Sequence, residues 1–85
     1  MYKILYSTSV LKELNELDNK EYLRIRDRIL ALESEPRPVG SLKLTNSDGY
    51  RVRSGDFRIL YEIDDNLKTV KLLRIGHRKD IYKKK

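Results

Sequence analysis

The sequence predicts a single α+β domain spanning residues 1–85. We expect an N-terminal strand, an antiparallel helical hairpin, and then a mainly antiparallel sheet of three to four strands with the helices on one face. Three observations predict it: apolar residues alternate over residues 2–6, recur at helical spacing over residues 10–32, and alternate again over residues 50–75. The chain has 85 residues and no cysteine, so one hydrophobic core must stabilise it without disulfides.

The first strand and the first helix follow each other directly. Tyr2, Ile4 and Tyr6 fall on one face of a strand over residues 2–6. The segment Ser7-Thr8-Ser9 then offers several N-cap residues for a helix. The expected apolar side of this helix consists of Val10, Leu14 and Leu17, with Leu11 beside them.

A second helix is expected to begin after Asp18, because this acid is followed three residues later by Glu21 in the manner of a capping box. Pro36 and Pro38 end it. The connection between the two helices spans only about two to four residues, which predicts an antiparallel hairpin. The expected apolar side of the second helix consists of Tyr22, Leu23, Ile25, Ile29, Leu30 and Leu32.

The second half of the chain is predicted to consist of strands separated by turns. Ser41–Thr45 predicts a short strand, and the composition of the next four residues predicts a loop. Ser54-Gly55-Asp56 and Asp64-Asp65-Asn66 are hairpin turn signals. The strands that these turns separate are Tyr50–Arg53, Phe57–Ile63 and Leu67–Ile75.

The first of these hairpins gathers arginines on one face. If it turns through Gly55-Asp56, Ser54 faces Phe57 and Arg53 faces Arg58. Because side chains alternate along a strand, Arg51 then joins both arginines on the face opposite the core residues. Like charges placed directly opposite each other are unfavourable, so an anion between them is indicated. Guanidinium groups suit phosphate, although these arginines could also extend into solvent or pair with Glu62.

The end of the last strand supplies further candidates. A second hairpin turning through Asp65-Asn66 places Val70 and Leu72 on the core face. Gly76 allows the chain to bend or leave the sheet, which would bring His77 and Arg78 near the arginines.

Net charge is distributed unevenly. Residues 1–36 hold six Lys/Arg against seven Asp/Glu, a net charge of −1, whereas residues 37–85 hold thirteen against six, a net charge of +7. The asymmetry suggests nucleic acid or an acidic protein as partner, although a solubilising surface accounts for the charge equally well. One histidine, no cysteine and scattered acids predict no metal site and no cofactor. Without a signal sequence or a long apolar segment, the protein is expected to be cytoplasmic and not bound to membranes.

Three stretches resemble the RelE/ParE superfamily of toxins, specifically its RelE-type mRNA interferases. These stretches are residues 49–63, 73–78 and 80–82. The resemblance implies a RelE-like fold and a basic active site with a tyrosine near the C-terminus. Its matching positions are Arg51, Arg53, Arg58, Arg78 and Tyr82. Family members often have lysine at the positions of Arg51 and Arg53. Lysine can lose a proton more readily than arginine, so the difference bears on the mechanism.

The resemblance also implies an activity and partners. RelE-type toxins cleave mRNA in the ribosomal A site by 2′-hydroxyl attack, leaving a 2′,3′-cyclic phosphate and a 5′-hydroxyl, and they need no metal. We assign catalysis to Arg53, Arg58, Arg78 and Tyr82. His77 is a candidate for proton transfer, because histidine is the residue type that ordinarily exchanges a proton near neutral pH. We assign RNA binding to Arg51, Lys79 and Lys83. The basic helix residues Arg24 and Arg28 and the terminal lysines are expected to add bulk attraction to ribosomal RNA.

A cognate RelB-like antitoxin is the implied protein partner. The toxin–antitoxin complex is expected to be a heterotetramer, and the free toxin a monomer. Two other functions fit the same scaffold. One is a ParE-like poison of DNA gyrase, and the other is a catalytically weak member that only binds RNA or antitoxin.

Overall fold

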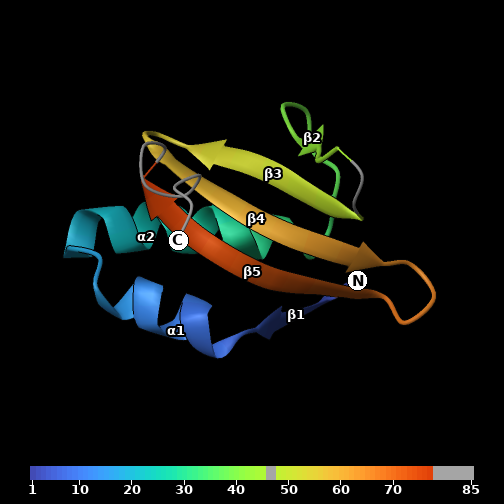
Figure 1. Ribbon diagram of the computed structural model, residues 1–85, viewed down its shortest axis with the longest axis horizontal. Helices are drawn as coiled ribbons and strands as arrows, with labels where there is room; N and C mark the ends of the chain where they lie inside the picture. Colours follow the sequence, from blue (N-terminus) through green and yellow to red (C-terminus); the bar gives the residue numbers. More distant parts are fainter. Residues whose placement is uncertain (46–47, 78–85) are drawn as a thin grey trace.

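The computed structural model of the chain describes residues 1–45 and 48–77, which form two layers. One layer is a mixed sheet with the strand order β1-β5-β4-β3-β2 (Figure 1). The strands are β1 (Lys3–Tyr6), β2 (Leu42–Lys43), β3 (Gly49–Ser54), β4 (Phe57–Asp64) and β5 (Thr69–His77). The other layer holds the helices α1 (Thr8–Asn15) and α2 (Asn19–Ala31), between which the chain reverses direction. The predicted α+β class and order of elements are confirmed.

β1 lies at the edge of the sheet, parallel to β5. Ile4 is opposite Val70, and Tyr6 is opposite Leu72. Parallel neighbours cannot be joined by a tight turn, and here both helices and three strands separate them along the chain. The sequence predicts β1 as a strand but does not predict its partner, so the expected sheet of three to four strands becomes a five-stranded mixed sheet.

Both helices begin at the predicted caps. The Ser7 hydroxyl accepts a hydrogen bond from the Val10 amide at 3.1 Å, and an Asp18 carboxylate oxygen accepts one from the Glu21 amide at 2.8 Å. Each bond satisfies an amide that has no partner within the helix. α2 ends at Ala31, ahead of both prolines. Within the described residues, neither helix is long and apolar enough to cross a bilayer.

The predicted apolar side of α2 is too wide. Ile25, Ile29 and Leu32 are buried against the sheet, whereas Leu23 and Leu30 are 43% and 45% exposed. Tyr22 is exposed as well. In a two-layer fold, the sheet covers only one stripe of each helix, and residues at spacings of four and three form that stripe. Leu23 and Leu30 lie seven residues apart on a neighbouring stripe, which the described residues leave uncovered.

The core lies between the sheet and the two helices. Its fully or almost fully buried members are Val10, Ile25, Ile29, Leu32, Val52, Ile59, Tyr61, Val70, Leu72 and Ile75. Tyr61 is the largest of them, and its hydroxyl donates a 2.7 Å hydrogen bond to the carbonyl of Pro36. Burial raises the pKa of Tyr61 to about 12, so this hydroxyl stays protonated and keeps donating. The bond joins the segment after α2 to the centre of the sheet.

The β4–β5 hairpin differs from its prediction in two ways. Its loop contains four residues, with the Asp64 carboxylate accepting a 2.9 Å hydrogen bond from the Leu67 amide, and β5 therefore begins at Thr69 instead of Leu67. Val70 and Leu72 still reach the core as predicted, because a shift of two residues preserves the faces. The second difference is a β-bulge: Tyr61 pairs with Leu72 but Leu60 pairs with Arg74, so one residue of β5 is left over.

A polar cluster, here called the Arg37 clasp, joins four distant segments. The Arg37 guanidinium donates to both carboxylate oxygens of Asp65, at 2.9 and 3.3 Å, and to the Tyr50 hydroxyl at 3.1 Å. The Tyr2 hydroxyl donates to Asp65 at 2.6 Å. The hydrogen bonds from Arg37 and Tyr2 hold the pKa of Asp65 below its usual range. The clasp connects the N-terminus, the segment after α2, β3 and the β4–β5 loop.

The lowered pKa of Asp65 predicts a pH-dependent contribution to stability. A carboxyl group whose pKa is lower in the folded state stabilises the protein above the unfolded pKa of about 3.9, and this contribution is lost as the pH falls. We expect the wild type to exceed Asp65→Asn in free energy of unfolding near neutral pH, with the difference vanishing in acid. Urea denaturation of both proteins across this range measures it.

Asp27→Asn is the matched control, because Asp27 pairs only with its exposed neighbour Arg26 in the described residues. A wild-type advantage over Asp65→Asn that stays constant down to strongly acidic pH would contradict the role of the clasp.

Candidate functional site

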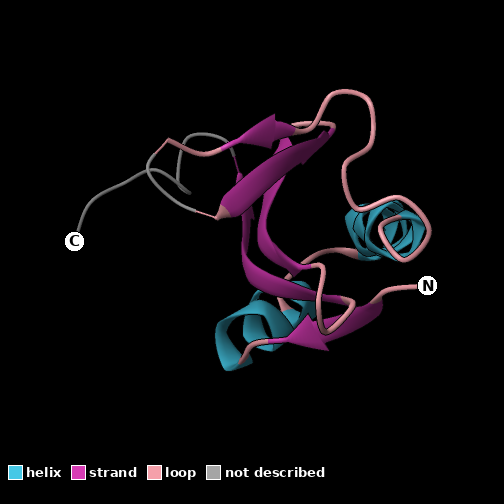
Figure 2. Cartoon of the chain, turned by 90° about the vertical axis from the view of Figure 1, so that its right-hand side faces the viewer, coloured by secondary structure: helices cyan, strands magenta, loops and turns pink. Residues whose placement is uncertain are grey.

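The candidate site lies on the face of the sheet that the helices leave uncovered, called the outer face here. Val10 of α1 and Ile25 of α2 both pack into the core on the opposite face. In Figure 2, one helix lies within the concave side of the curved sheet and the other lies beside its lower end. Arg53 is directly opposite Arg58 in the β3–β4 ladder, and Arg51 is opposite Leu60. Arg51 and Arg58 are half-buried, and Arg53 is exposed. The structure therefore brings together the three predicted arginines of this hairpin, which we call the arginine cluster.

The β3–β4 turn produces this register. Ser54 pairs with Phe57 and encloses the two-residue turn Gly55-Asp56, as predicted. Gly55 has a φ of 63°, a left-handed value that favours glycine at the first position of such a turn. The inward residues Val52, Ile59 and Tyr61 are buried, which excludes a slip by one residue, because a slip would expose all of them. The positions of the arginines thus follow from core burial and turn chemistry together.

Charge on the outer face changes sign along the strands. Glu62 lies opposite Gly49 on one side and Lys71 on the other, four residues along β4 from Arg58. Glu62, Asp48 and Asp64 line a groove at this end of the face. The sequence left open that Glu62 pairs with these arginines. Among the described residues, Glu62 forms no ion pair with any of them. A polyanion is therefore attracted to the end of the face near Arg53 and repelled from the other.

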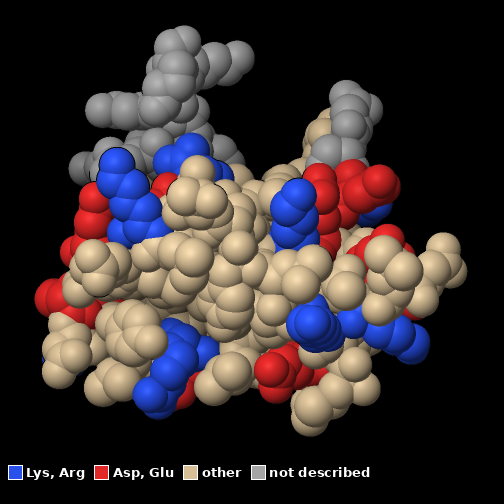
Figure 3. All heavy atoms as spheres, turned by 90° about the horizontal axis from the view of Figure 1, so that it is seen from below, with Lys and Arg blue, Asp and Glu red and all other residues tan. Residues whose placement is uncertain are grey.

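The clustering of like charges is local. Figure 3 shows the side of the molecule that carries α1 and β1, where basic and acidic side chains are scattered around an uncharged middle. This side offers no extended field of one sign. The arginine cluster is thus a feature of the hairpin and not a consequence of the net charge of +6 alone.

The structure does not bring the side chain of His77 to the arginine cluster. β5 continues through Gly76 without leaving the sheet, and His77 pairs with Phe57, whose face is that of the core. The two rings meet edge to face with centroids 5.8 Å apart. The bulge in β5 is the cause, since the extra residue turns every later side chain to the opposite face. Gly76 takes the position opposite Arg58 instead, so β5 places no side chain directly across from that arginine.

One residue that holds this end of β5 was missed in the sequence. A Glu13 carboxylate oxygen accepts a 2.6 Å hydrogen bond from the Arg74 guanidinium, and the other accepts one from the Ile75 amide at 2.7 Å. β1 ends opposite Leu72, so Glu13 of α1 takes over the edge of β5 beyond it. The available signal was Arg74 between the apolar residues Leu73 and Ile75, because a half-buried charge requires a partner.

Arg78, Lys79, Tyr82 and Lys83, the other residues predicted for catalysis and RNA binding, lie outside the described residues. Their assignments stay predictions.

Sequence comparison decides the family. A family model described as "ParE toxin of type II toxin-antitoxin system, parDE" matches residues 4–82. Toxin RelG of Mycobacterium tuberculosis is 32% identical over 85 residues, which cover 98% of each chain. The chain belongs to the RelE/ParE toxin superfamily.

Solved structures agree with this membership. The RelE–RelB complex of Pyrococcus horikoshii contains a chain that matches with a TM-score of 0.83 and 30% identity, covering 93% of this chain and 97% of that one. RelBE2 of Mycobacterium tuberculosis matches with a TM-score of 0.81 and 28% identity, covering 91% and 98%. The RelBE complex of E. coli, at 22% identity and a TM-score of 0.78, supports the fold alone. The chain is thus a toxin-type member of a type II toxin–antitoxin family with the RelE-like fold.

The position of His77 generates a prediction for His77→Ala. The variant loses the edge-to-face contact with Phe57, and we expect its free energy of unfolding to fall by about 0.5–1.5 kcal/mol beyond the effect of lost area. A double-mutant cycle with Phe57→Leu measures this coupling. A coupling energy near zero would contradict this packing role of His77.

Proposed function

We propose that this superfamily member is a ribosome-dependent endoribonuclease that cleaves mRNA in the A site and so inhibits translation. The arginine cluster carries the proposal, because Arg53 opposite Arg58 with Arg51 beside them is a pattern that stability does not favour and a phosphate does. The resemblance to RelE-type toxins supports the same activity. The reaction takes place in the cytoplasm, where ribosomes and messenger meet.

The proposed reaction is an internal phosphoryl transfer. The ribose 2′-oxygen attacks the adjacent phosphorus, the bond from phosphorus to the 5′-oxygen breaks, and the 2′ proton leaves to a base while the 5′-oxygen gains one. The products are a 2′,3′-cyclic phosphate and a 5′-hydroxyl. Negative charge grows on the phosphate oxygens in the transition state, and preplaced guanidinium groups stabilise it. We assign this role to Arg58 and Arg78.

The remaining predicted residues bind and orient the substrate in this proposal. Arg53 and Arg51 hold phosphates and polarise the 2′-hydroxyl, Tyr82 stacks on a base or takes part in proton transfer, and Lys79 and Lys83 contact RNA phosphates. Arginine stays protonated up to about pH 12, so it serves as electrostatic partner and not as general base. Fixing the RNA in a bent geometry on the ribosome supplies much of the remaining acceleration by orientation.

The proposed protein partner is a RelB-like antitoxin. Solved relatives include complexes named RelE–RelB, from Pyrococcus horikoshii and Methanococcus jannaschii. The antitoxin covers the basic surface, and the toxin–antitoxin complex is a heterotetramer while the free toxin is a monomer.

A second candidate function is poisoning of DNA gyrase, which the ParE description of the matching family model favours. The arginine cluster argues against it, since the ParE branch generally lacks the basic constellation that the resemblance assigns to RelE-type members.

The ends of cleaved messenger test the proposal. Purified toxin added to a translating extract is expected to yield mRNA fragments with 5′-hydroxyl ends that fall within codons. Replacing Arg58 with glutamine removes one donor to the transition state, and we expect cleavage to slow by about 10²–10³-fold. Primer extension combined with kinase-dependent end labelling measures both.

Arg26→Gln is the matched control, because it removes the same charge from α2, where Arg26 pairs with Asp27 instead. Intact messenger together with inhibited supercoiling by purified gyrase would contradict the ribonuclease and establish the second candidate. Equal cleavage by the Arg58 and Arg26 variants would contradict the assignment of Arg58.

A further inference from the structure

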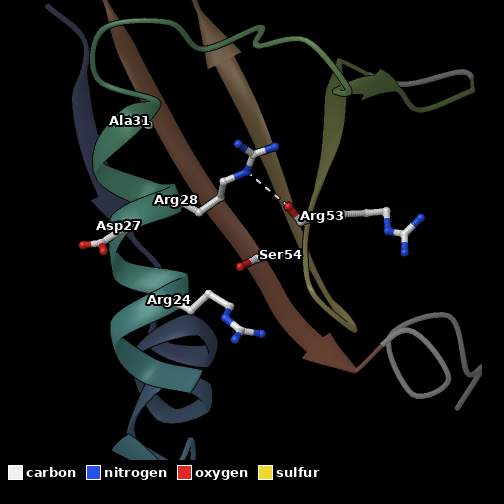
Figure 4. Close-up of a pocket in the computed structure, with 6 residues that line it drawn as sticks. All are labelled: Arg24, Asp27, Arg28, Ala31, Arg53 and Ser54. Atoms are coloured by element: carbon white, nitrogen blue, oxygen red, sulfur yellow. Dashed lines mark hydrogen bonds between the residues drawn. The ribbon is translucent and has the colours of Figure 1, made fainter. Parts of the chain in front are cut away.

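A second basic site lies on the other side of β3 from the arginine cluster. Here α2 runs along the part of β3 that β2 does not reach, since β2 pairs only with Arg51 and Tyr50. Between them is an open groove of about 400 Å³. Figure 4 shows Arg24 and Arg28 extending from α2 toward β3, with Ser54 facing them across the groove. Arg24 and Arg28 are four residues apart and therefore lie on one side of the helix.

Neither arginine is neutralised within the described residues. Arg28 donates from Nε to the Arg53 carbonyl at 3.1 Å, and no described residue forms a hydrogen bond with its two terminal nitrogens. Arg24 has no hydrogen bond or ion pair in the described part of the chain; its guanidinium packs beside the β3–β4 turn, 3.0 Å from where a side chain on Gly55 would begin. Asp27 lines the groove but points away from β3 and is bonded to Arg26 at 3.0 Å.

Arg53 connects this groove to the arginine cluster. Its carbonyl oxygen faces the groove and accepts the bond from Arg28, whereas its side chain points away from α2 (Figure 4). Basic groups therefore stand on both sides of the same short segment of β3. Like charges four residues apart weaken a helix, so holding Arg24 beside Arg28 along a strand edge makes physical sense when an anion with repeated charges lies there.

We propose that the α2–β3 groove is a second phosphate-binding subsite, which holds the sugar–phosphate backbone of RNA that continues past the arginine cluster around the end of β3. Arg24 and Arg28 donate to phosphate oxygens through their free guanidinium nitrogens, and the groove carries no reacting group. The subsite rests on the proposed function for its ligand, but its binding is separable from cleavage. The sequence predicted only a bulk attraction of Arg24 and Arg28 for ribosomal RNA, whereas the groove gives both residues a defined binding position.

The backbone can belong to messenger or to ribosomal RNA, which share this chemistry. The first probe is a short fluorescent single-stranded RNA whose 2′-hydroxyls are methylated, so that it binds without being cleaved. The second is the purified 70S ribosome, with binding measured by sedimentation. Both are titrated with toxin over a range of salt concentrations, because each phosphate contact contributes about 0.7 to the slope of log affinity against log salt for single strands.

The test variant is Arg24→Gln/Arg28→Gln, and the control is Arg26→Gln/Lys12→Gln, which removes the same charge from the two helices outside the groove. We expect the test variant to lose about 1.4 from the single-strand salt slope and the control to leave it unchanged. Arg24→Gln alone, which breaks no hydrogen bond of the fold, is expected to lose about 0.7. A loss confined to the ribosome probe assigns the subsite to ribosomal RNA and also supports the proposal.

The proposed subsite would be overturned if the test variant had the same salt slope and the same affinity as the control with both RNA probes. Weaker binding of poly-L-glutamate with unchanged RNA binding would overturn it in favour of an acidic protein partner. Failure of the proposed function is distinguishable: messenger that stays intact while the test variant loses salt slope overturns the ribonuclease and leaves the groove as an RNA site. Normal cleavage with an unchanged slope overturns the groove alone.

Discussion

The placement of Arg53 directly opposite Arg58 is the constraint on which the account of this protein depends. The pair is held by a turn whose left-handed φ favours glycine at Gly55 and by the burial of Val52 and Ile59 on the reverse face. Neither of these determinants involves the arginines themselves. The scaffold thus places two like charges opposite each other, a pairing that is unfavourable by itself, and we propose that an RNA phosphate is the anion that this site binds.

The rest of the fold leaves this hairpin accessible on both sides. The helices cover only the core face, and β2 pairs with β3 at Tyr50 and Arg51 but not beyond. The far end of the outer face carries Glu62 and Asp64, whose charge disfavours a polyanion there. The stabilising contacts lie on the core face and at the edges of the sheet: Tyr61 anchors the segment after α2, the Arg37 clasp joins the N-terminus to the β4–β5 loop, and Glu13 holds the end of β5. This separation of the two faces lets the outer face carry unfavourable charge without loss of the fold.

Local signals in the sequence predicted the local features. The Asp18 cap and the β3–β4 register both follow from a few neighbouring residues, and the structure confirms them. Features that depend on distant contacts were not predictable. The parallel pairing of β1 with β5 and the position of Glu13 join segments about sixty residues apart, because only the assembled core brings them together. Among these features, the bulge in β5 has the largest effect on the candidate site. It turns His77 away from the arginine cluster and places Gly76 opposite Arg58.

The arginine cluster and the α2–β3 groove together form a basic surface on both sides of one end of β3. Arg53 takes part in both through different atoms, its guanidinium on one side and its carbonyl on the other. Substitutions of its side chain therefore affect the cluster while leaving the bond to Arg28 available. This makes Arg53 the most informative single position on the surface.

Thermal unfolding of the wild type and Arg53→Thr, each with and without 2′-O-methylated RNA, tests whether Arg53 binds an anion at the expense of sheet stability. Threonine suits a strand and removes one of two opposed charges, so we expect Tm without RNA to be equal to or above that of the wild type. RNA binding to the folded state raises Tm in proportion to its affinity, and we expect this increase to be smaller for the variant. A variant with a lower Tm and the full RNA-induced increase would contradict the claim, because Arg53 would then stabilise the sheet and not bind an anion.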